Sequence, residues 1–289
     1  DTEAKKPTSR TNINFDTNYR NANESRKESS KGLTAGINLN YSINDNNDIG
    51  FIYSSNFWDT RQNGRNENKF FTTSTNVLDS IQNTPFYNKN KYNYHSLSSY
   101  YDLKIDSLGK KMNINFNLLT KDNKNNRDFS TSSYIGNYES LNYYNAAINN
   151  SHSKFNVYSL NVDFTLPYKF ANIETGSKIT FVENNSEIEF FKNTPGNPIF
   201  DPTKSNEFNY KERVTAFYVS ANKEIGEKWT AQFGLRYENT ETIGNSLTLN
   251  TKQKNNFGNL FPSAYLTYDP NENNSFSIEW RESITCNKS

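Results

Sequence analysis

Apolar and polar residues alternate strictly along several segments of the chain. Between Leu33 and Tyr41 every odd-numbered residue is apolar or aromatic, whereas the residues between them are Thr, Gly and Asn. Successive side chains of a β-strand point to opposite faces, so this pattern predicts a strand with one apolar and one polar face. An α-helix, with its period of 3.6 residues, does not produce it.

Five further segments have the same period. Their apolar residues are Ile49, Phe51, Tyr53 and Phe57; Met112, Ile114, Phe116 and Leu118; Tyr158, Leu160, Val162, Phe164 and Leu166; Trp229, Ala231, Phe233, Leu235 and Tyr237; and Phe276, Ile278 and Trp280. Weaker candidates at residues 12–19, 92–105, 173–190, 211–222 and 258–268 bring the expected total to about eleven strands. Pro262 counts against the last candidate, because proline cannot donate to a neighbouring strand.

The connections between these segments are of two kinds. Short polar turns are expected at residues 44–48, 106–110, 168–172, 224–227 and 269–274, and long polar loops near residues 62–90, 125–152, 191–207 and 241–256. Short and long connections alternate along the chain. Outer-membrane β-barrels have this asymmetry, with tight turns on the periplasmic side and long loops outside the cell.

These features predict an all-β fold, a segment of an antiparallel transmembrane β-barrel. Several runs reach the roughly 9–11 residues that cross a membrane at a tilt, against about 5–6 in a typical soluble strand. The residues expected to face lipid are Leu33, Ile37, Leu39, Phe51, Ile114, Phe116, Leu160, Val162, Phe164, Phe233, Leu235, Phe276 and Ile278. The aromatic residues expected at the membrane interfaces are Tyr41, Trp58, Trp229, Tyr237 and Trp280.

Composition narrows the class of protein further. Only 33% of the residues are hydrophobic and the mean hydropathy is −0.94, yet 15% are aromatic and the net charge is +1, which does not fit a disordered chain. The 32 basic and 31 acidic residues are interspersed, so no cationic face for nucleic acid is expected. Cys286 is the single cysteine, which excludes an internal disulfide.

No residue pattern indicates catalysis, a metal or a cofactor. His95 and His152 are far apart in sequence and lack ligand spacing. The carboxylates Glu187 and Glu189 share a face in a polar stretch, where solvation explains them better than acid–base chemistry. The sequence NDNND at residues 44–48 resembles the start of a calcium loop. It lacks the glycine and the distal glutamate of such a loop, so we interpret it as a hairpin turn. The sequence therefore predicts a protein that is not an enzyme.

One loop is distinctive. Residues 194–202 read TPGNPIFDP, in which Pro and Gly restrict the backbone and Ile199 and Phe200 are expected to be exposed. Both residues are candidates for contact with a ligand at the cell surface, although a merely rigid loop is the simpler interpretation.

Two segments carry a family resemblance. EIGEKWTAQFGLRYE at residues 224–238 and FPSAYLTYDPNENNSFSIEWRESIT at residues 261–285 resemble the outer-membrane β-barrel domain of TonB-dependent receptor-like proteins. The resemblance implies a parent barrel of about 22 strands, a plug domain before this segment, and a TonB-type energy-coupling protein that acts through the plug. Residues 1–289 are then expected to be a partial barrel domain that lacks the plug and the closing strands. The family commonly continues with an Arg-Pro pair, whereas this chain ends at residues 285–289 with TCNKS.

The functional hypothesis is a barrel portion of a TonB-dependent receptor that binds and takes up a nutrient of unknown identity across the outer membrane. Its expected partners are outer-membrane lipid, the energy-coupling protein and the nutrient. Two alternatives stay open: a passive porin-like barrel, which would lack a plug, and a secreted β-rich adhesin, which membrane fractionation would distinguish.

Overall fold

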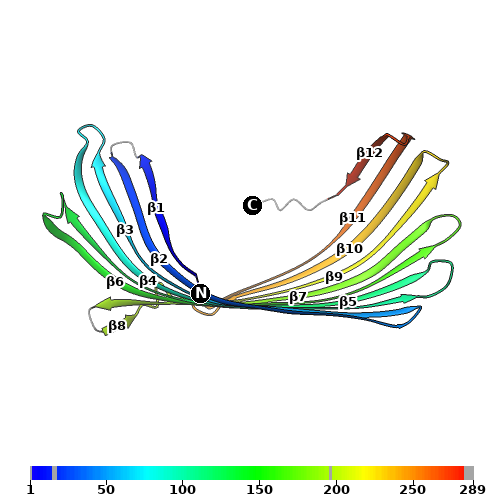
Figure 1. Cartoon of the computed structure of the whole chain (residues 1–289), viewed down its shortest axis with the longest axis horizontal. Coiled ribbons are helices and arrows are strands. Elements are labelled where there is room, and N and C mark those ends of the chain that lie inside the picture. Colours follow the sequence, from blue (N-terminus) through cyan, green and yellow to red (C-terminus); the bar gives the residue numbers. More distant parts are fainter. Residues whose placement is uncertain (1, 15–17, 195–196, 283–289) are drawn as a thin grey trace.

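The computed structural model describes residues 2–14, 18–194 and 197–282, and it contains strands but no helix within these ranges. All strands belong to one antiparallel sheet of twelve strands (Figure 1). They are β1 (Thr2–Asn14), β2 (Asn18–Asn44), β3 (Asn47–Thr72), β4 (Val77–Lys104), β5 (Lys111–Ile135), β6 (Ser140–Pro167), β7 (Asn172–Thr194), β8 (Asn197–Phe200), β9 (Asn206–Ile225), β10 (Trp229–Ser246), β11 (Thr251–Asn271) and β12 (Asn274–Arg281). Among the described residues, none forms a helix long and apolar enough to cross a membrane.

The sheet is a continuous up-and-down meander. Each strand pairs with its neighbour along the chain, except that β7 pairs with β9 and the short β8 pairs with β7 to one side of this path. The path therefore has eleven strands, which confirms the predicted all-β, antiparallel sheet of about eleven strands. The sheet curls into an open trough, and its edge strands β1 and β12 stand on opposite sides of the opening (Figure 1).

The five short turns form where the sequence predicts them. The β2–β3 turn consists of Asp45 and Asn46. The Asn44 side-chain oxygen accepts hydrogen bonds from the Asn46 amide (2.9 Å) and the Asn47 side chain (2.7 Å). This is the local turn chemistry for which Asn is favoured, so the interpretation of residues 44–48 as a hairpin turn is confirmed.

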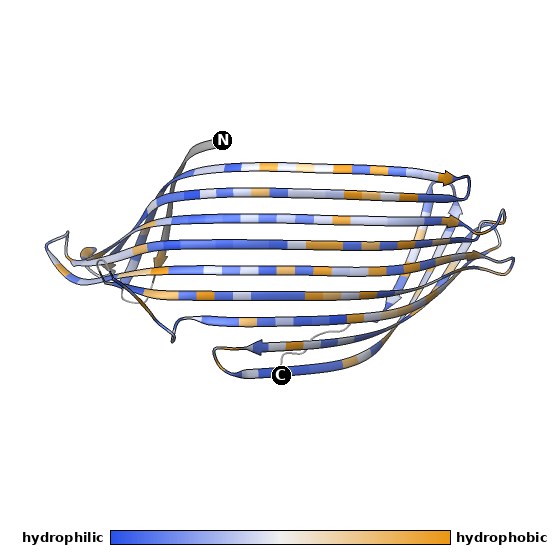
Figure 2. Ribbon diagram, turned by 90° about the horizontal axis from the view of Figure 1, so that it is seen from below, coloured by the Kyte–Doolittle hydropathy of each residue, from blue (hydrophilic) through white to orange (hydrophobic). Residues whose placement is uncertain are grey.

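The prediction of four long loops is wrong. Most of their residues belong to strands, and the connections from β3 to β4, β5 to β6 and β10 to β11 are four residues long, at 73–76, 136–139 and 247–250. The backbone ladders continue there although both faces of the strands are polar. In Figure 2, apolar and polar residues alternate along part of the long strands, while long stretches elsewhere are hydrophilic. Alternation in sequence therefore marks only one part of each long strand.

The structure also bears on three smaller expectations, which concern residues 12–19, the loop at residues 194–202 and Pro262. The candidate strand at residues 12–19 spans two strands, because β1 ends at Asn14 and β2 begins at Asn18. The distinctive loop contains the short strand β8, which the sequence did not predict. Pro262 lies within β11: its carbonyl accepts from the Glu282 amide (3.2 Å), so the proline nitrogen also faces the β12 side and the ladder with β10 is preserved. Residues 285–289 lie outside the described ranges.

Few side chains are buried, because a single sheet has no second layer to cover it. The buried hydrophobic residues in the described ranges are Ile81, Ala146, Ala147, Ala216 and Ala231. Many large apolar side chains are exposed instead, among them Leu33 (62%) and Phe233 (64%). In a water-soluble protein such a surface would need a partner, so the sheet requires an apolar environment on one side.

Candidate functional site: the two faces of the sheet

The register brings the alternating apolar residues of neighbouring strands together. Tyr41, Ile49, Tyr101, Ile114 and Val162 are successive partners from β2 to β6. Directly opposed residues lie on the same side of a sheet. One side, here called the apolar face, therefore carries all the residues expected to face lipid: Leu33, Ile37, Leu39, Phe51, Ile114, Phe116, Leu160, Val162, Phe164, Phe233, Leu235, Phe276 and Ile278.

Exposure distinguishes the apolar face from the opposite side, here called the polar face. In β10, Phe233, Leu235 and Tyr237 are exposed, whereas Gly234 and Arg236 between them are half-buried. Side chains spread apart on the convex side of a curved sheet and crowd together on the concave side. The exposure pattern thus indicates that the apolar face is convex, as the lipid-facing wall of a barrel must be.

Four of the five predicted interfacial aromatic residues lie on the apolar face. Trp229 stacks on Tyr268 at the short-turn end of β10, with ring centroids 4.4 Å apart. Tyr41, Tyr237 and Trp280 are also on this face and exposed. Contact of these rings with a membrane interface remains a proposal.

Trp58 is the exception, because the ladder places it on the polar face. It pairs with Gly32 and Tyr92, which belong to the polar face, and β3 continues beyond it to Thr72. A single residue step moves a side chain to the other face, so the apolar position is that of its neighbour Phe57. The Trp58 ring instead lies over Gly32, where a Cβ would overlap it.

The polar face forms a hydrogen-bonded wall near the short-turn end. The Tyr218 hydroxyl donates to Asp163, and the Asn113 amide donates to Asp102. A cavity of about 330 Å³ is lined by Asp48, Asp102 and Asp163 together with Asn113. Such a surface can hold water or a polar solute.

Hydrogen bonding on the polar face continues along the hairpins beyond the apolar residues. The Gln62 side chain donates to Glu28 (2.8 Å) and accepts from Asn88 (3.2 Å), which links β2, β3 and β4. Further along, burial raises the pKa of the Tyr210 phenol to about 12, and a hydrogen bond to Glu212 adds to this effect. Polar side chains therefore cover a wall that is far longer than the membrane-crossing part alone.

The distinctive loop is folded around Asp201. The Asp201 carboxylate accepts from the Thr203 hydroxyl (2.6 Å) and pairs with Lys192 (3.3 Å), and both interactions lower its pKa. Its backbone amide donates to the Phe190 carbonyl (2.8 Å). Ile199 and Phe200 in β8 are 55% and 48% exposed. They are therefore accessible on a loop that these hydrogen bonds and the ion pair hold in place. Their role in ligand contact remains a proposal.

Both histidines have a neighbour with which they share a hydrogen bond. His95 lies 2.8 Å from the Tyr53 hydroxyl, and His152 lies 2.9 Å from Asp122. Glu187, one of the two adjacent carboxylates, is paired across the ladder with His152 on the apolar face. In the part of the chain that the structure describes, no group of three or more His, Cys, Asp or Glu residues could hold a metal ion.

Comparison with known proteins assigns the family. The model of the outer membrane protein beta-barrel family matches residues 103–285, which is more than half of the chain. The chain belongs to this family. Its apolar and polar faces are therefore the two sides of an outer-membrane barrel wall, and the protein is located in the bacterial outer membrane.

Solved structures similar to the chain include three outer-membrane proteins. The ferric citrate transporter FecA in its unliganded form is 11% identical, with a TM-score of 0.40, over 92% of this chain and 42% of that one. The siderophore receptor PiuA from Acinetobacter baumannii is 12% identical, with a TM-score of 0.44, over 90% and 47%. The translocator domain of the autotransporter NalP from Neisseria meningitidis is 8% identical, with a TM-score of 0.28, over 93% and 84%. The chain spans less than half the length of the first two, and no curated protein matches it.

Proposed function

We propose that the chain forms part of the barrel of a TonB-dependent receptor that binds a nutrient and takes it up across the outer membrane, without catalysing a reaction. In this proposal a plug domain outside this chain closes the lumen, and a TonB-type protein supplies the energy through it. Family membership and the resemblance of residues 224–238 and 261–285 to the barrels of such receptors support the proposal.

The observation that carries the binding step is the length of the hydrogen-bonded polar face. About 9–11 residues suffice to cross a membrane, whereas β4 and β6 have 28 residues each. The surplus length extends the polar wall beyond the membrane, where Glu28, Gln62 and Asn88 form a cross-strand network. A hydrated wall outside the membrane can bind a polar nutrient before it enters the barrel.

Energy coupling separates this function from that of a passive porin-like barrel. Cells that lack the TonB-type protein should still bind the labelled nutrient at their surface but should fail to accumulate it, because the barrel supplies no free energy of its own. Uptake should be restored when the coupling protein is supplied again. Uptake that is unaffected by its loss would favour the passive barrel, and a sequence without an upstream plug would favour it independently.

A further inference from the structure

Basic side chains adjoin the apolar residues on the convex face. Lys31, Asp59, Lys91 and Lys124 are successive partners across β2, β3, β4 and β5 and thus form one row. Lys31 lies two residues before Leu33 in β2, hence on the same face. The row therefore begins directly where the apolar residues of β2 and β3 end, on the side of the long hairpins.

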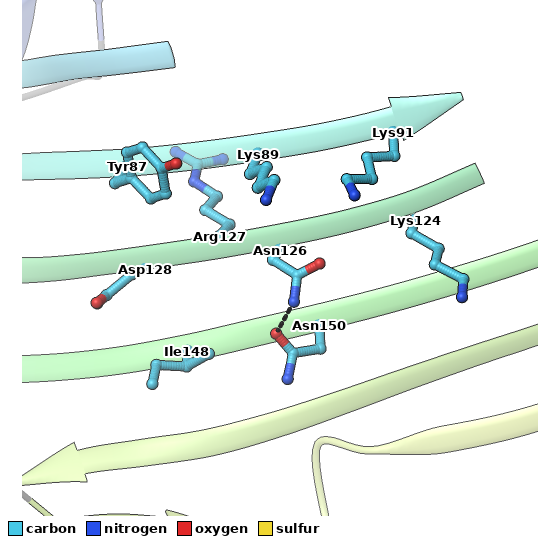
Figure 3. Close-up of a pocket in the computed structure, with 9 residues that line it drawn as sticks. All are labelled: Tyr87, Lys89, Lys91, Lys124, Asn126, Arg127, Asp128, Ile148 and Asn150. Atoms are coloured by element: carbon cyan, nitrogen blue, oxygen red, sulfur yellow. Dashed lines mark hydrogen bonds between the residues drawn. The ribbon is translucent and has the colours of Figure 1, made fainter. Parts of the chain in front are cut away.

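Two grooves that share Lys91 mark this surface. The first, of about 400 Å³, is lined by Leu33 and Phe57 together with Lys31 and Lys91. The second, of about 440 Å³, is lined by Lys89, Lys91 and Lys124 (Figure 3). The grooves lead from an apolar wall to a cluster of ammonium groups.

The second groove gathers its lysines from two neighbouring strands. Figure 3 shows Lys89 and Lys91 on β4 and Lys124 on β5, beside Asn126, which donates to Asn150 (2.9 Å). Arg127 is drawn beside them, but its guanidinium packs on the Phe86 ring, 4.9 Å from its centroid, and Phe86 belongs to the polar face. The lysines are thus the cationic groups that the second groove presents on the convex side.

The charge of the surface is unbalanced. Arg61 and the four lysines share the convex face with three carboxylates, Asp59, Asp122 and Asp128. Asp59 is already paired with Arg61 (3.7 Å), and Asp122 with His152 (2.9 Å). Lys89, Lys91 and Lys124 form no ion pair with any residue that the structure describes. Three lysines without a carboxylate partner on one small surface favour an anionic ligand.

We propose that this surface binds the phosphorylated headgroup of a membrane lipid in the leaflet on the hairpin side. The lipid's acyl chains lie against Leu33 and Phe57, and its phosphate lies among Lys89, Lys91 and Lys124. A nutrient in the lumen does not reach this convex face, whereas lipid surrounds it. The proposal rests on family membership and not on nutrient uptake, so the two can fail separately.

The test compares lipid binding by matched double variants. The protein is placed in nanodiscs of phosphatidylcholine with or without phosphatidic acid, and lipid that stays bound after release is measured by native mass spectrometry. The variant is Lys91→Gln with Lys124→Gln. The control is Lys252→Gln with Lys254→Gln, which removes the same charge from exposed residues of β11 on the same face. Each lysine near an anionic lipid surface contributes a factor of about five, so the variant should lose about 30-fold in affinity.

Each outcome decides the proposal. Loss of phosphatidic acid in the Lys91/Lys124 variant alone, with retention in a Lys91→Arg, Lys124→Arg variant, supports it. An equal loss of phosphatidic acid in both double variants would show unspecific attraction between charges and would overturn the proposal. Unchanged binding in both variants would show that no lipid site lies at these lysines and would overturn it as well. Displacement of the lipid by inorganic phosphate would show that a free anion suffices and would also overturn it. Heat-resistant migration of each variant on gels verifies that the barrel is folded.

Discussion

The Tyr100 side chain lies across Gly50 and donates a hydrogen bond to Asn40 (2.8 Å). Gly50 is the ladder partner of both residues, so one tyrosine on β4 reaches over β3 to β2. Tyr218 repeats the arrangement: it lies over Gly176 and donates to Asp163 two strands away. On the polar face, an aromatic ring thus covers the glycine backbone and joins three strands.

A side chain at Gly50 should disturb this arrangement. In Gly50→Ala the new Cβ would overlap the Tyr100 ring, which must move and lose its bond to Asn40. We expect a loss of about 1–3 kcal/mol in the free energy of unfolding, as for other overpacked sites. Urea-induced unfolding in lipid bilayers, followed by tryptophan fluorescence, measures it.

Gly36→Ala is the matched control. Gly36 is in β2 and, like Gly50 in β3, lies on the polar face. A Cβ at Gly36 would meet only the Tyr53 carbonyl at 3.4 Å. It should leave the unfolding midpoint unchanged or slightly higher. Tyr100→Phe keeps the ring and removes only the hydroxyl, so it should cost about 1 kcal/mol. Equal effects of the two glycine substitutions would contradict the role of the ring.

The sequence could predict features that depend on neighbouring residues within one strand or turn, but not contacts between strands. Alternation reveals which residues share a face within a strand, so Val162 and Phe233 could be assigned to a face from sequence. The short turns could be recognised from their Asn, Asp or Gly residues. The hairpins beyond the apolar residues could not be recognised, because polar residues on both faces leave no period. Their tips depend on left-handed backbone at single residues such as Asn76 (φ 54°) and Asn250 (φ 50°).

Two features could be recognised only from the register of the strands: the row of Lys31, Asp59, Lys91 and Lys124, and the face on which Trp58 lies. Lys31, Lys91 and Lys124 are far apart in sequence and become neighbours only through three ladders. Trp58 follows Phe57 directly, and only the pairing with Gly32 shows on which face it lies. Sequence alone contains no information on which residues of distant strands are opposed.

Lipid contact of the apolar face can be tested at Val162, the middle residue of the apolar run in β6. A lysine on the lipid side near the bilayer centre costs roughly 2–4 kcal/mol. Val162→Lys should therefore impair assembly, whereas Val162→Phe should be tolerated, because lipid has no fixed shape with which to clash. Assembly into bilayers and the unfolding midpoint are the measurements.

Ser159→Lys is the control on the polar face of the same strand. Ser159 is preferable to Asp163 here, because Asp163 accepts the Tyr218 hydroxyl and its replacement would have a cost of its own. Ser159→Lys should be nearly neutral in a hydrated lumen. If Val162→Phe destabilises as much as Val162→Lys, the apolar face is packed against protein and not against lipid.

The orientation of the barrel can be tested with chymotrypsin on whole cells. The protease should cut after Tyr138 and Leu249, which lie exposed at the tips of the long hairpins. It should spare Leu108 and Phe170, which are also strongly exposed (76% and 66%) but lie in short turns at the opposite end. After lysis all four sites should be cut. Cleavage at the short turns in intact cells would reverse the orientation.

The loop that presents Ile199 and Phe200 should loosen in acid. Asp201 has its pKa held below the ordinary value of 3.8 by the Thr203 hydroxyl and Lys192, so folding of the loop favours the charged carboxylate. A lowered pKa gives stability that is present above pH 3.8 and is lost as pH falls through the folded value. Asp201→Asn should show the loosened state already at neutral pH.

A spin label reports this change directly. With Cys286 replaced by serine, a label at Asn197→Cys in the exposed strand β8 should be restricted at neutral pH and become mobile as the pH falls below 3.8. A label at Asn273→Cys, in the β11–β12 turn, should not respond, because Asp201 is bound to Thr203, Lys192 and Phe190 and not to that turn. In the Asp201→Asn variant the β8 label should be mobile at every pH. A label that stays restricted in acid and in the variant would show that the backbone bond from Asp201 to Phe190 and the Ser205 contacts hold the loop without the carboxylate.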